Sequence, residues 1–190
     1  YLAQKGIPVH VFNYYGFYSG SYYPREYLNS GQLLVKQVNH YTSRQKRIVL
    51  AKAFVDAASF NILKNLRYYG NRGKGVDEYI NTIEGFRSQI EKIEAVEELM
   101  GIEGNIRNTY YKAWPTIIDQ EIEFERRVKQ PPDNMINALI SYLNSMVYTT
   151  CLGELYHTQL NPLISYLHEP GERRFSLSLD LAEIFKPIFS

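Results

Sequence analysis

The chain has 190 residues, of which 45% are hydrophobic and 22% are charged, with a formal net charge of +1. This composition is that of an ordinary globular domain that is long enough to bury a core. No run of about 18 apolar residues is present, so the pattern excludes a transmembrane helix and we expect no membrane partner. The single cysteine, Cys151, excludes an internal disulfide and is compatible with the cytoplasmic location that we expect. The chain lacks an initiator Met and ends just after a helical pattern, so we expect it to be a piece of a longer protein.

Residues 7–12 and 17–23 have the β-branched and aromatic composition of strands, and residues 13–16 between them break the pattern. We therefore predict a hairpin, which would be the end of a small β domain over residues 1–28. Its aromatic side chains could stack on nucleic-acid bases. Cross-strand aromatic pairs are the more common use of such residues, and we favour that interpretation.

Helical periodicity begins near Gly31 and is clearest in a stripe of apolar residues at spacings of three and four. The stripe consists of Ile48, Ala51, Val55, Ala58 and Ile62. Residues 69–75 form a Gly-rich loop, but they lack the preceding strand and the Gly-Lys-Ser/Thr ending of a phosphate-binding loop.

Four more helices are predicted, over residues 76–100, 102–114, 134–157 and 175–185. The breaks between them are at Gly101, Pro115, Pro131-Pro132 and a loop over residues 164–174. The predicted fold class is therefore mainly α, with a helical domain over residues 29–190 that follows the remnant of a small β domain.

Charge is distributed unevenly along this helical region. Residues 36–74 contain nine Lys or Arg and one acid, whereas residues 75–133 contain thirteen acids and seven bases. A basic helix can follow the phosphates of a nucleic acid through Coulomb attraction and counterion release. The alternative is that the basic segment is a solvated face that pairs with the acidic segment after it, and charge alone favours this alternative.

Four residues are candidates for chemistry. Glu103 lies in a helix, His168 lies in a loop flanked by Pro and Gly, and Asp180 and Glu183 are three apart on one helix face among apolar residues. Carboxylates with a neutral imidazole suit Mn²⁺, and Mg²⁺ less well, and such an ion can activate a hydroxyl and polarise a phosphate. The alternative is that the acids are the polar side of an amphipathic helix and His168 is an ordinary loop residue.

Three runs of residues appear in the order found in a known family. They are GIEGNIRNTYY at residues 101–111, PPDNMINALISY at residues 131–142, and LNPLISYLHEP at residues 160–170 followed by FSLSLDLAEIFKP at residues 175–187. They resemble the signatures of CRISPR-associated protein one, the integrase of CRISPR adaptation. The similarity covers nearly the whole chain and implies that the helical domain is catalytic.

The resemblance implies that Glu103, His168 and Glu183 bind Mn²⁺ or Mg²⁺, so their functional atoms should converge within reach of one ion. Many relatives have Asp at the position of Glu183, and both side chains can bind a metal. Asp180 matches a nearby acidic residue of the family. It would assist catalysis by binding a neighbouring donor and orienting the site, or it would substitute as a metal ligand.

The resemblance also places a base that contacts DNA at Lys186 and, more loosely, at Arg47. The alternatives are that Lys186 is a cation stabilised by the helix C-terminus and that Arg47 is a surface base. Tyr110, Asn137 and Tyr142 lie in the signatures, and we interpret them as packing or supporting residues.

The implied reaction is attack by a 3′-hydroxyl of prespacer DNA on a phosphodiester of the CRISPR repeat. With water in place of the hydroxyl, the same site would act as an endonuclease. Relatives form homodimers, two of which flank a dimer of CRISPR-associated protein two, and they continue with further helices after the position of Ser190. The alternative function is a non-catalytic helical module that binds nucleic acid or protein.

Overall fold

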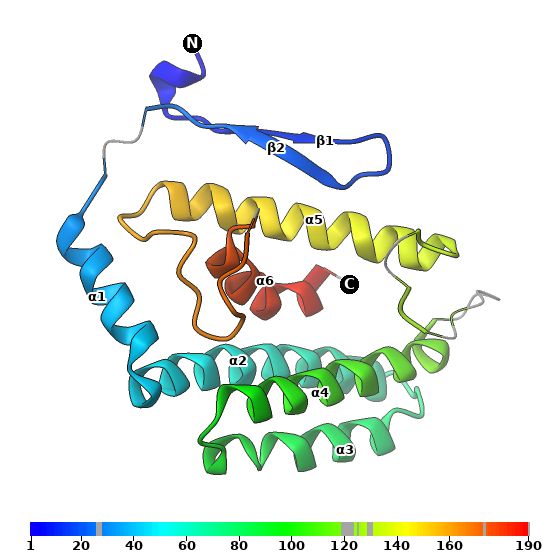
Figure 1. The fold of residues 1–190 in the computed structure, drawn as a ribbon. Helices are drawn as coiled ribbons and strands as arrows, with labels where there is room; N and C mark the ends of the chain where they lie inside the picture. Colours follow the sequence, from blue (N-terminus) through cyan, green and yellow to red (C-terminus); the bar gives the residue numbers. More distant parts are fainter. Residues whose placement is uncertain (26–27, 119–123, 125, 129–130, 173, 190) are drawn as a thin grey trace.

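A short β-hairpin and a set of helices make up the protein, and the computed structural model describes residues 1–25, 28–118, 124, 126–128, 131–172 and 174–189 (Figure 1). A 3₁₀ turn at Ala3–Lys5 precedes the antiparallel strands β1 (Val9–Phe12) and β2 (Tyr18–Tyr22). The helices are α1 (Gly31–Thr42), α2 (Arg44–Gly70), α3 (Asp77–Arg87), α4 (Val96–Ile117), α5 (Met135–Tyr156) and α6 (Ser176–Phe189). The predicted mainly α fold class is confirmed.

The hairpin forms where the sequence predicted it. The Asn13 side chain accepts hydrogen bonds from the backbone N–H groups of Tyr15 and Phe17, both at 3.0 Å, and thereby closes the turn. Gly16 has a positive φ of 77°, which a residue with a side chain rarely adopts. The hairpin lies along α5 (Figure 1), where the rings of Tyr18 and Tyr148 are 5.6 Å apart. Phe12 and Tyr18 are opposite one another in the strand register with ring centroids 6.3 Å apart, a cross-strand aromatic pair of the kind we favoured, whereas Tyr14 and Tyr15 in the turn are exposed.

Helix α2 is at the centre of the helical domain. Figure 1 shows α6 between α2 and α5, with α3 and α4 on the other side of α2. In the predicted stripe, Ala51, Val55, Ala58 and Ile62 are buried, while Ile48 is partly buried against the same core. The stripe therefore packs on residues of α3 and α4 and of the turn between them, and burial of its apolar surface holds these elements against α2.

The structure corrects the helix predicted over residues 76–100. It ends as α3 at Arg87, and a 3₁₀ turn at Ile90–Lys92 precedes the start of α4 at Val96. Ile90 and Ile93 are buried in one cluster with residues of α2 and α4. A continuous helix could not place both of them there while α3 and α4 pack side by side, so tertiary burial overrides the local helical pattern.

The predicted break at Gly101 is also wrong, because α4 passes through this residue and continues to Ile117. Nothing lies within 4 Å of the position that a Cβ atom at Gly101 would take. No neighbouring group therefore packs against this glycine in a way that would interrupt the helix. Pro115 does not stop the helix at once, because it lies in the last turn, where few backbone hydrogen bonds remain to be lost. Helix α6 likewise runs through Pro187, past the predicted end at residue 185.

Helix α5 agrees closely with its prediction over residues 134–157. Asn134 caps it, since its side chain accepts a hydrogen bond from the Asn137 N–H at 2.8 Å. Residues 157–175 connect α5 to α6 and include the predicted loop, and Asn161 forms a turn in it by accepting the Leu163 N–H at 2.9 Å. Among the described residues, no helix is long and apolar enough to cross a membrane.

Part of the basic segment pairs with the acidic one. Arg67 of α2 bonds Glu84 of α3 at 2.5 Å, and Arg87 of α3 bonds Asp56 of α2 at 2.7 Å. Lys52 donates to the backbone carbonyl of Glu91 at 2.7 Å. These contacts support the alternative in which the basic segment is a solvated face that pairs with the acidic segment. Residues 119–123 and 125, which include four of the acids that were counted, lie outside the described residues.

Candidate functional site

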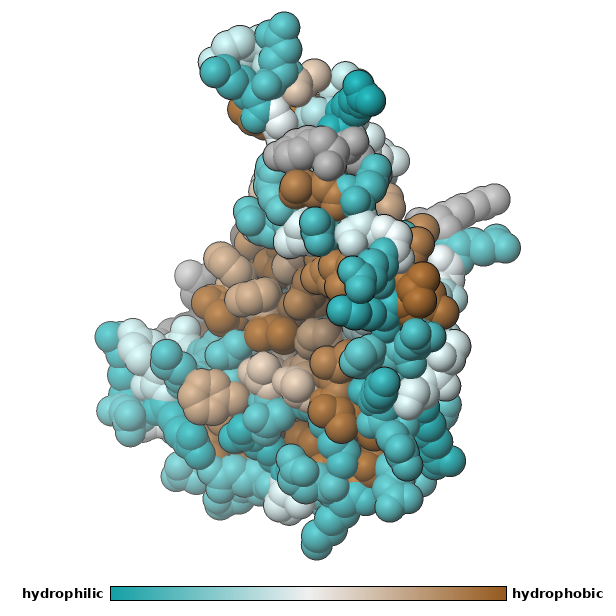
Figure 2. All heavy atoms as spheres, turned by 90° about the vertical axis from the view of Figure 1, so that its left-hand side faces the viewer, coloured by the Kyte–Doolittle hydropathy of each residue, from teal (hydrophilic) through white to brown (hydrophobic). Residues whose placement is uncertain are grey.

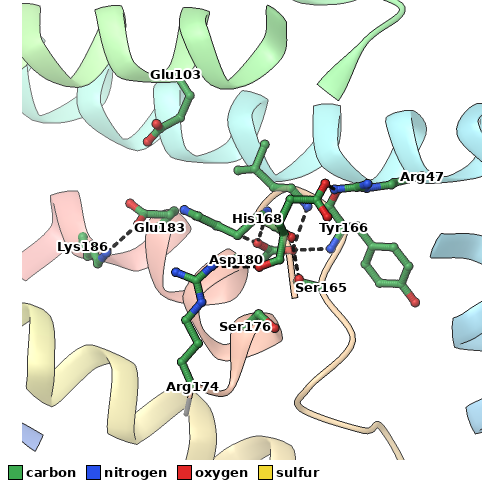
Figure 3. A network of polar contacts seen from close by, with 12 residues as sticks. Arg47, Glu103, Ser165, Tyr166, His168, Arg174, Ser176, Asp180, Glu183 and Lys186 are labelled. Carbon is green, nitrogen blue, oxygen red and sulfur yellow. Dashed lines mark hydrogen bonds and ion pairs between the residues drawn. The ribbon is translucent and has the colours of Figure 1, made fainter. Parts of the chain in front are cut away.

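The four candidate residues come from three separate segments that meet beside α2. Glu103 is on α4 and points toward α6, Asp180 and Glu183 are on α6, and His168 is in the loop that leads into α6 (Figure 3). Helix α6 packs on both α2 and α5, and α4 packs on α2. Packing against the shared helix α2 therefore brings the first signature of the sequence to the last one.

Asp180 organises the loop that carries His168. It is fully buried, and one of its oxygens, Oδ2, accepts the N–H groups of Tyr166 at 2.6 Å and Leu167 at 2.9 Å. The other, Oδ1, accepts the N–H of His168 at 3.0 Å and lies 2.9 Å from the Nδ1 atom of its ring. Both oxygens are therefore saturated with protein donors. An imidazole that donates from Nδ1 to a carboxylate presents the lone pair of Nε2 as a ligand.

A second group of contacts ties the same loop to α1 and α2. The Nε atom of Arg47 donates to the carbonyl of Tyr166 at 2.9 Å, and its Nη2 donates to Glu169 at 2.6 Å. Tyr41 donates its hydroxyl to Glu169 at 2.7 Å, and the Arg47 guanidinium lies over its ring at 4.5 Å. The Arg47 side chain is only 13% exposed. A DNA contact by Arg47, as the resemblance implied, would require it to leave these partners.

The two glutamates share one cation that the sequence interpretation did not include. A single nitrogen of Arg107, Nη2, bonds Oε1 of Glu103 and also bonds Oε2 of Glu183 at 2.5 Å. The second oxygen of Glu183 accepts Lys186 Nζ at 2.5 Å. Arg107 is four residues after Glu103 in the run at residues 101–111, so the spacing at which helix neighbours meet was a signal that could have identified it.

The combined effect of burial and neighbouring charges shifts the pKa values of the two glutamates in opposite directions. For Glu103, burial raises the pKa, and Arg107 offsets only part of that rise. For Glu183, burial also favours the protonated form, but Lys186 and Arg107 outweigh it and hold the pKa below its usual range. A protonated His168 would lower the pKa of both glutamates, so the imidazole lies within electrostatic range of the two carboxyls.

The chemistry of these donors fits a divalent cation. One buried and one partly buried carboxylate already converge on one positive group, and a histidine whose ring is held by Asp180 lies near them. Within the part of the chain that the structure describes, no three His, Cys, Asp or Glu side chains are close enough to hold an ion as they stand. Binding of one ion by Glu103, His168 and Glu183 would therefore require side chains to move, Arg107 first among them.

The remaining signature residues support the fold, as we interpreted them. Tyr110 is buried, and its hydroxyl accepts a hydrogen bond from Asn65 at 2.8 Å. Asn137 is fully buried at the start of α5 and bonds Asp133 at 2.7 Å. Tyr142 is half-exposed and lies against Gly16 of the hairpin. None of these three contacts involves the candidate site.

A cavity of about 420 Å³ lies elsewhere, between the start of α1, the end of α5 and the loop that follows α5. Its lining is largely apolar and includes Leu34, Leu152, Leu155, Leu160 and Phe175. Figure 2 shows apolar side chains gathered on this face of the molecule. The lining contains none of the four candidate residues, so the cavity is separate from the site described above.

Comparison with known proteins agrees with the resemblance in the sequence. The family model described as CRISPR associated protein Cas1 matches residues 1–190. The chain is 61% identical over 188 residues to the CRISPR-associated endonuclease Cas1 of Fusobacterium nucleatum, covering 99% of this chain and 56% of that protein. It is 53% identical over 191 residues to an endonuclease Cas1 of Thermodesulfovibrio yellowstonii, covering 100% of this chain and 58% of the relative. The chain therefore spans just over half the length of these relatives.

Solved structures share the fold. A Cas1 protein of Thermotoga maritima superposes with a TM-score of 0.83 at 44% identity, covering 98% of this chain and 58% of that one. A casposase bound to its integration product superposes with a TM-score of 0.82 at 22% identity, covering 99% and 53%. A complex described as Cas6-RT-Cas1–Cas2 gives 0.81 at 17% identity, covering 97% and 20%. At these two lower identities, the likeness shows the fold alone.

Proposed function

Because the chain belongs to the family of CRISPR associated protein Cas1, we propose that it is the metal-dependent catalytic part of a DNA endonuclease and integrase. The relatives that are 61% and 53% identical are both named endonucleases, which supports the nuclease activity. The observation that carries the proposal is the buried site itself, where Glu103 and Glu183 share one cation beside a histidine that Asp180 orients.

In this proposal Glu103, Glu183 and Nε2 of His168 hold Mn²⁺ or Mg²⁺. When bound, the ion supplies Lewis-acid chemistry, since it polarises a phosphate and lowers the pKa of an attacking hydroxyl. Asp180 is a positioning residue, because both of its oxygens are taken up by the His168 loop. Lys186, which is bonded to Glu183, provides a cation beside the site that can attract the DNA backbone.

The proposed reaction is transesterification. The 3′-hydroxyl oxygen of a prespacer end forms a bond to a phosphorus of the CRISPR repeat, and the bond from that phosphorus to the repeat's own 3′-oxygen breaks. The departing oxygen takes up a proton, while the attacking hydroxyl loses one. Water in place of the 3′-hydroxyl gives cleavage of the DNA strand.

We further propose that the full-length protein acts as a homodimer with DNA and with a dimer of CRISPR-associated protein two. The support is the shared fold with a Cas1–Cas2 complex and with a casposase that holds its integration product. The 44% identity to the Thermotoga maritima Cas1 protein supports the assignment to the Cas1 family on which this proposal depends.

Substitution of Glu183 in the full-length protein tests the proposed site against the non-catalytic alternative. Glu183→Gln should lose Mn²⁺ binding in isothermal titration and should lose integration of a prespacer into a plasmid that carries the repeat. The matched control is Glu84→Gln, which removes an exposed carboxylate that pairs with Arg67 and contacts none of the site residues named above. Circular dichroism verifies that both variants are folded. Mn²⁺ affinity and integration that are equal in the two variants would refute the proposal and favour a binding module.

A further inference from the structure

Arg107 occupies the place in the site where one cation is shared. Its Nη2 atom bonds a carboxylate oxygen from α4 and another from α6, and the two glutamates are separated by 80 residues of sequence. Two carboxylates that converge on a single atom are the arrangement that a metal ion also requires. A nitrogen atom and an ion cannot occupy the same position, so the guanidinium has to move before one ion can bridge Glu103 and Glu183.

The Arg107 side chain has a route out of the site. It is 29% exposed, whereas the side chains of Glu103 and Glu183 are 15% and 7% exposed. The more accessible partner can turn toward solvent while the two glutamates stay on their helices. A partly exposed arginine with a long side chain, next to less exposed acids, is therefore able to exchange with an ion.

Charge compensation also favours an exchange. Glu103 and Glu183 are compensated by Arg107 and Lys186, while Asp180 is compensated separately by its hydrogen-bond donors. Addition of a divalent ion brings two more positive charges to carboxylates that Arg107 and Lys186 already neutralise. Excess positive charge beside a DNA-cutting site attracts the anionic phosphate backbone.

We propose that Arg107 is a placeholder cation, which neutralises Glu103 and Glu183 in the metal-free protein, leaves them when a divalent ion binds, and then contacts a DNA phosphate. This inference rests on the proposed function, because it assigns a further residue to the same site. In this mechanism, metal binding increases the affinity for DNA and DNA binding increases the affinity for the metal, because the ion displaces Arg107, which then contacts a DNA phosphate.

Titration of the full-length protein with Mn²⁺ in the absence of DNA tests the first half of the inference. Arg107→Met removes the charge but keeps an apolar stem, and the matched control is Arg67→Met, which breaks the exposed pair with Glu84. An ion that binds Arg107→Met has no charge-assisted hydrogen bonds to displace, so its affinity should rise about tenfold or more. The melting temperature without metal should fall, and Mn²⁺ should raise it by more than in the wild type. Arg67→Met should show neither change.

Fluorescence anisotropy with a short labelled DNA duplex tests the second half. Mn²⁺ should strengthen DNA binding of the wild type more than that of Arg107→Met, and the salt dependence of binding should fall by about one phosphate contact in the variant when Mn²⁺ is present. Equal strengthening by Mn²⁺ in the two proteins would overturn the phosphate contact.

Two results would overturn the placeholder role. Weaker Mn²⁺ binding by Arg107→Met would mean that Arg107 stays on the glutamates and orients them, and unchanged binding would mean that it serves the fold alone. If Arg107→Met does not fold, Arg107→Gln is measured in the same way, and a crystal of the wild type soaked in Mn²⁺ gives an independent result. Arg107 still bonded to both glutamates beside a bound ion refutes the exchange. Loss of Mn²⁺ binding in Glu183→Gln without a gain in Arg107→Met refutes this inference alone, whereas Mn²⁺ binding unaffected by Glu183→Gln refutes the proposed site.

Discussion

Asp180→Asn is the substitution whose effect follows most directly from the geometry of the site. Asparagine has nearly the same shape, but one of its two acceptor oxygens becomes an NH₂ donor and the negative charge is lost. Each oxygen of Asp180 interacts with two donor groups: one with the N–H groups of Tyr166 and Leu167, the other with the N–H and ring Nδ1 of His168. If the NH₂ group faces Tyr166 and Leu167, two buried donors face another donor. If it faces His168, the backbone N–H faces another donor, and the ring has to change tautomer to accept from the amide at Nδ1.

The size of the effect follows from the number of unsatisfied groups. A buried donor that loses its partner costs about 1–3 kcal/mol, so one or two of them cost about 1–6 kcal/mol in the free energy of unfolding. Typical domains are stable by only about 5–15 kcal/mol, so the loss should be large. The control is Asp56→Asn, which weakens the surface pair with Arg87, where Asp56 is 54% exposed. Such a pair contributes about 0–1 kcal/mol.

Urea unfolding of both variants, followed by circular dichroism, measures this difference as a shift of the midpoint at constant slope. Mn²⁺ affinity should also fall about 10–100-fold in Asp180→Asn, as when a carboxylate behind a histidine ligand is removed. The fall should be smaller than in Glu183→Gln, because Glu183 is the proposed ligand. A loss of stability no larger than that of Asp56→Asn, or normal Mn²⁺ affinity in Glu183→Gln together with lost affinity in Asp180→Asn, would refute the reasoning.

Two further predictions concern titrating groups. Hydrogen bonds from Tyr41 and Arg47 hold the pKa of Glu169 below its ordinary value of 4.5, so the stabilisation is present above that value and is lost as the pH falls through the lower pKa of the folded state. Glu169→Gln should therefore lose less stability than the wild type on acidification in urea unfolding at a series of pH values, and identical pH profiles would contradict this. Burial raises the pKa of the Cys151 thiol to about 11, so a thiol reagent at neutral pH should modify the folded protein far more slowly than the protein in urea, and equal rates would show that the thiol is accessible.

Local patterns in the sequence were sufficient for the elements whose stability is local. The hairpin depends on a turn that Asn13 and Gly16 form by themselves, and α5 begins where the Asn134 side chain caps it. The apolar stripe of α2 identified the buried face of that helix, because burial follows the helical period wherever a helix lies in the core. The resemblance added the candidate residues, which the structure places on neighbouring elements.

Only the tertiary structure decided what depends on residues far apart in the chain. The bend between α3 and α4 exists because Ile90 and Ile93 reach a core that α2 provides, and no local signal marks it. Arg47 has the appearance of a surface base in the sequence, yet the packing of the loop after α5 places Tyr166 and Glu169 around it. Arg107 bridges Glu103 and Glu183 only because α6 packs against α2 beside α4. Charges interact most strongly over a few ångströms, so the partner of a buried charge depends on which helices pack together. Local sequence patterns do not contain that information.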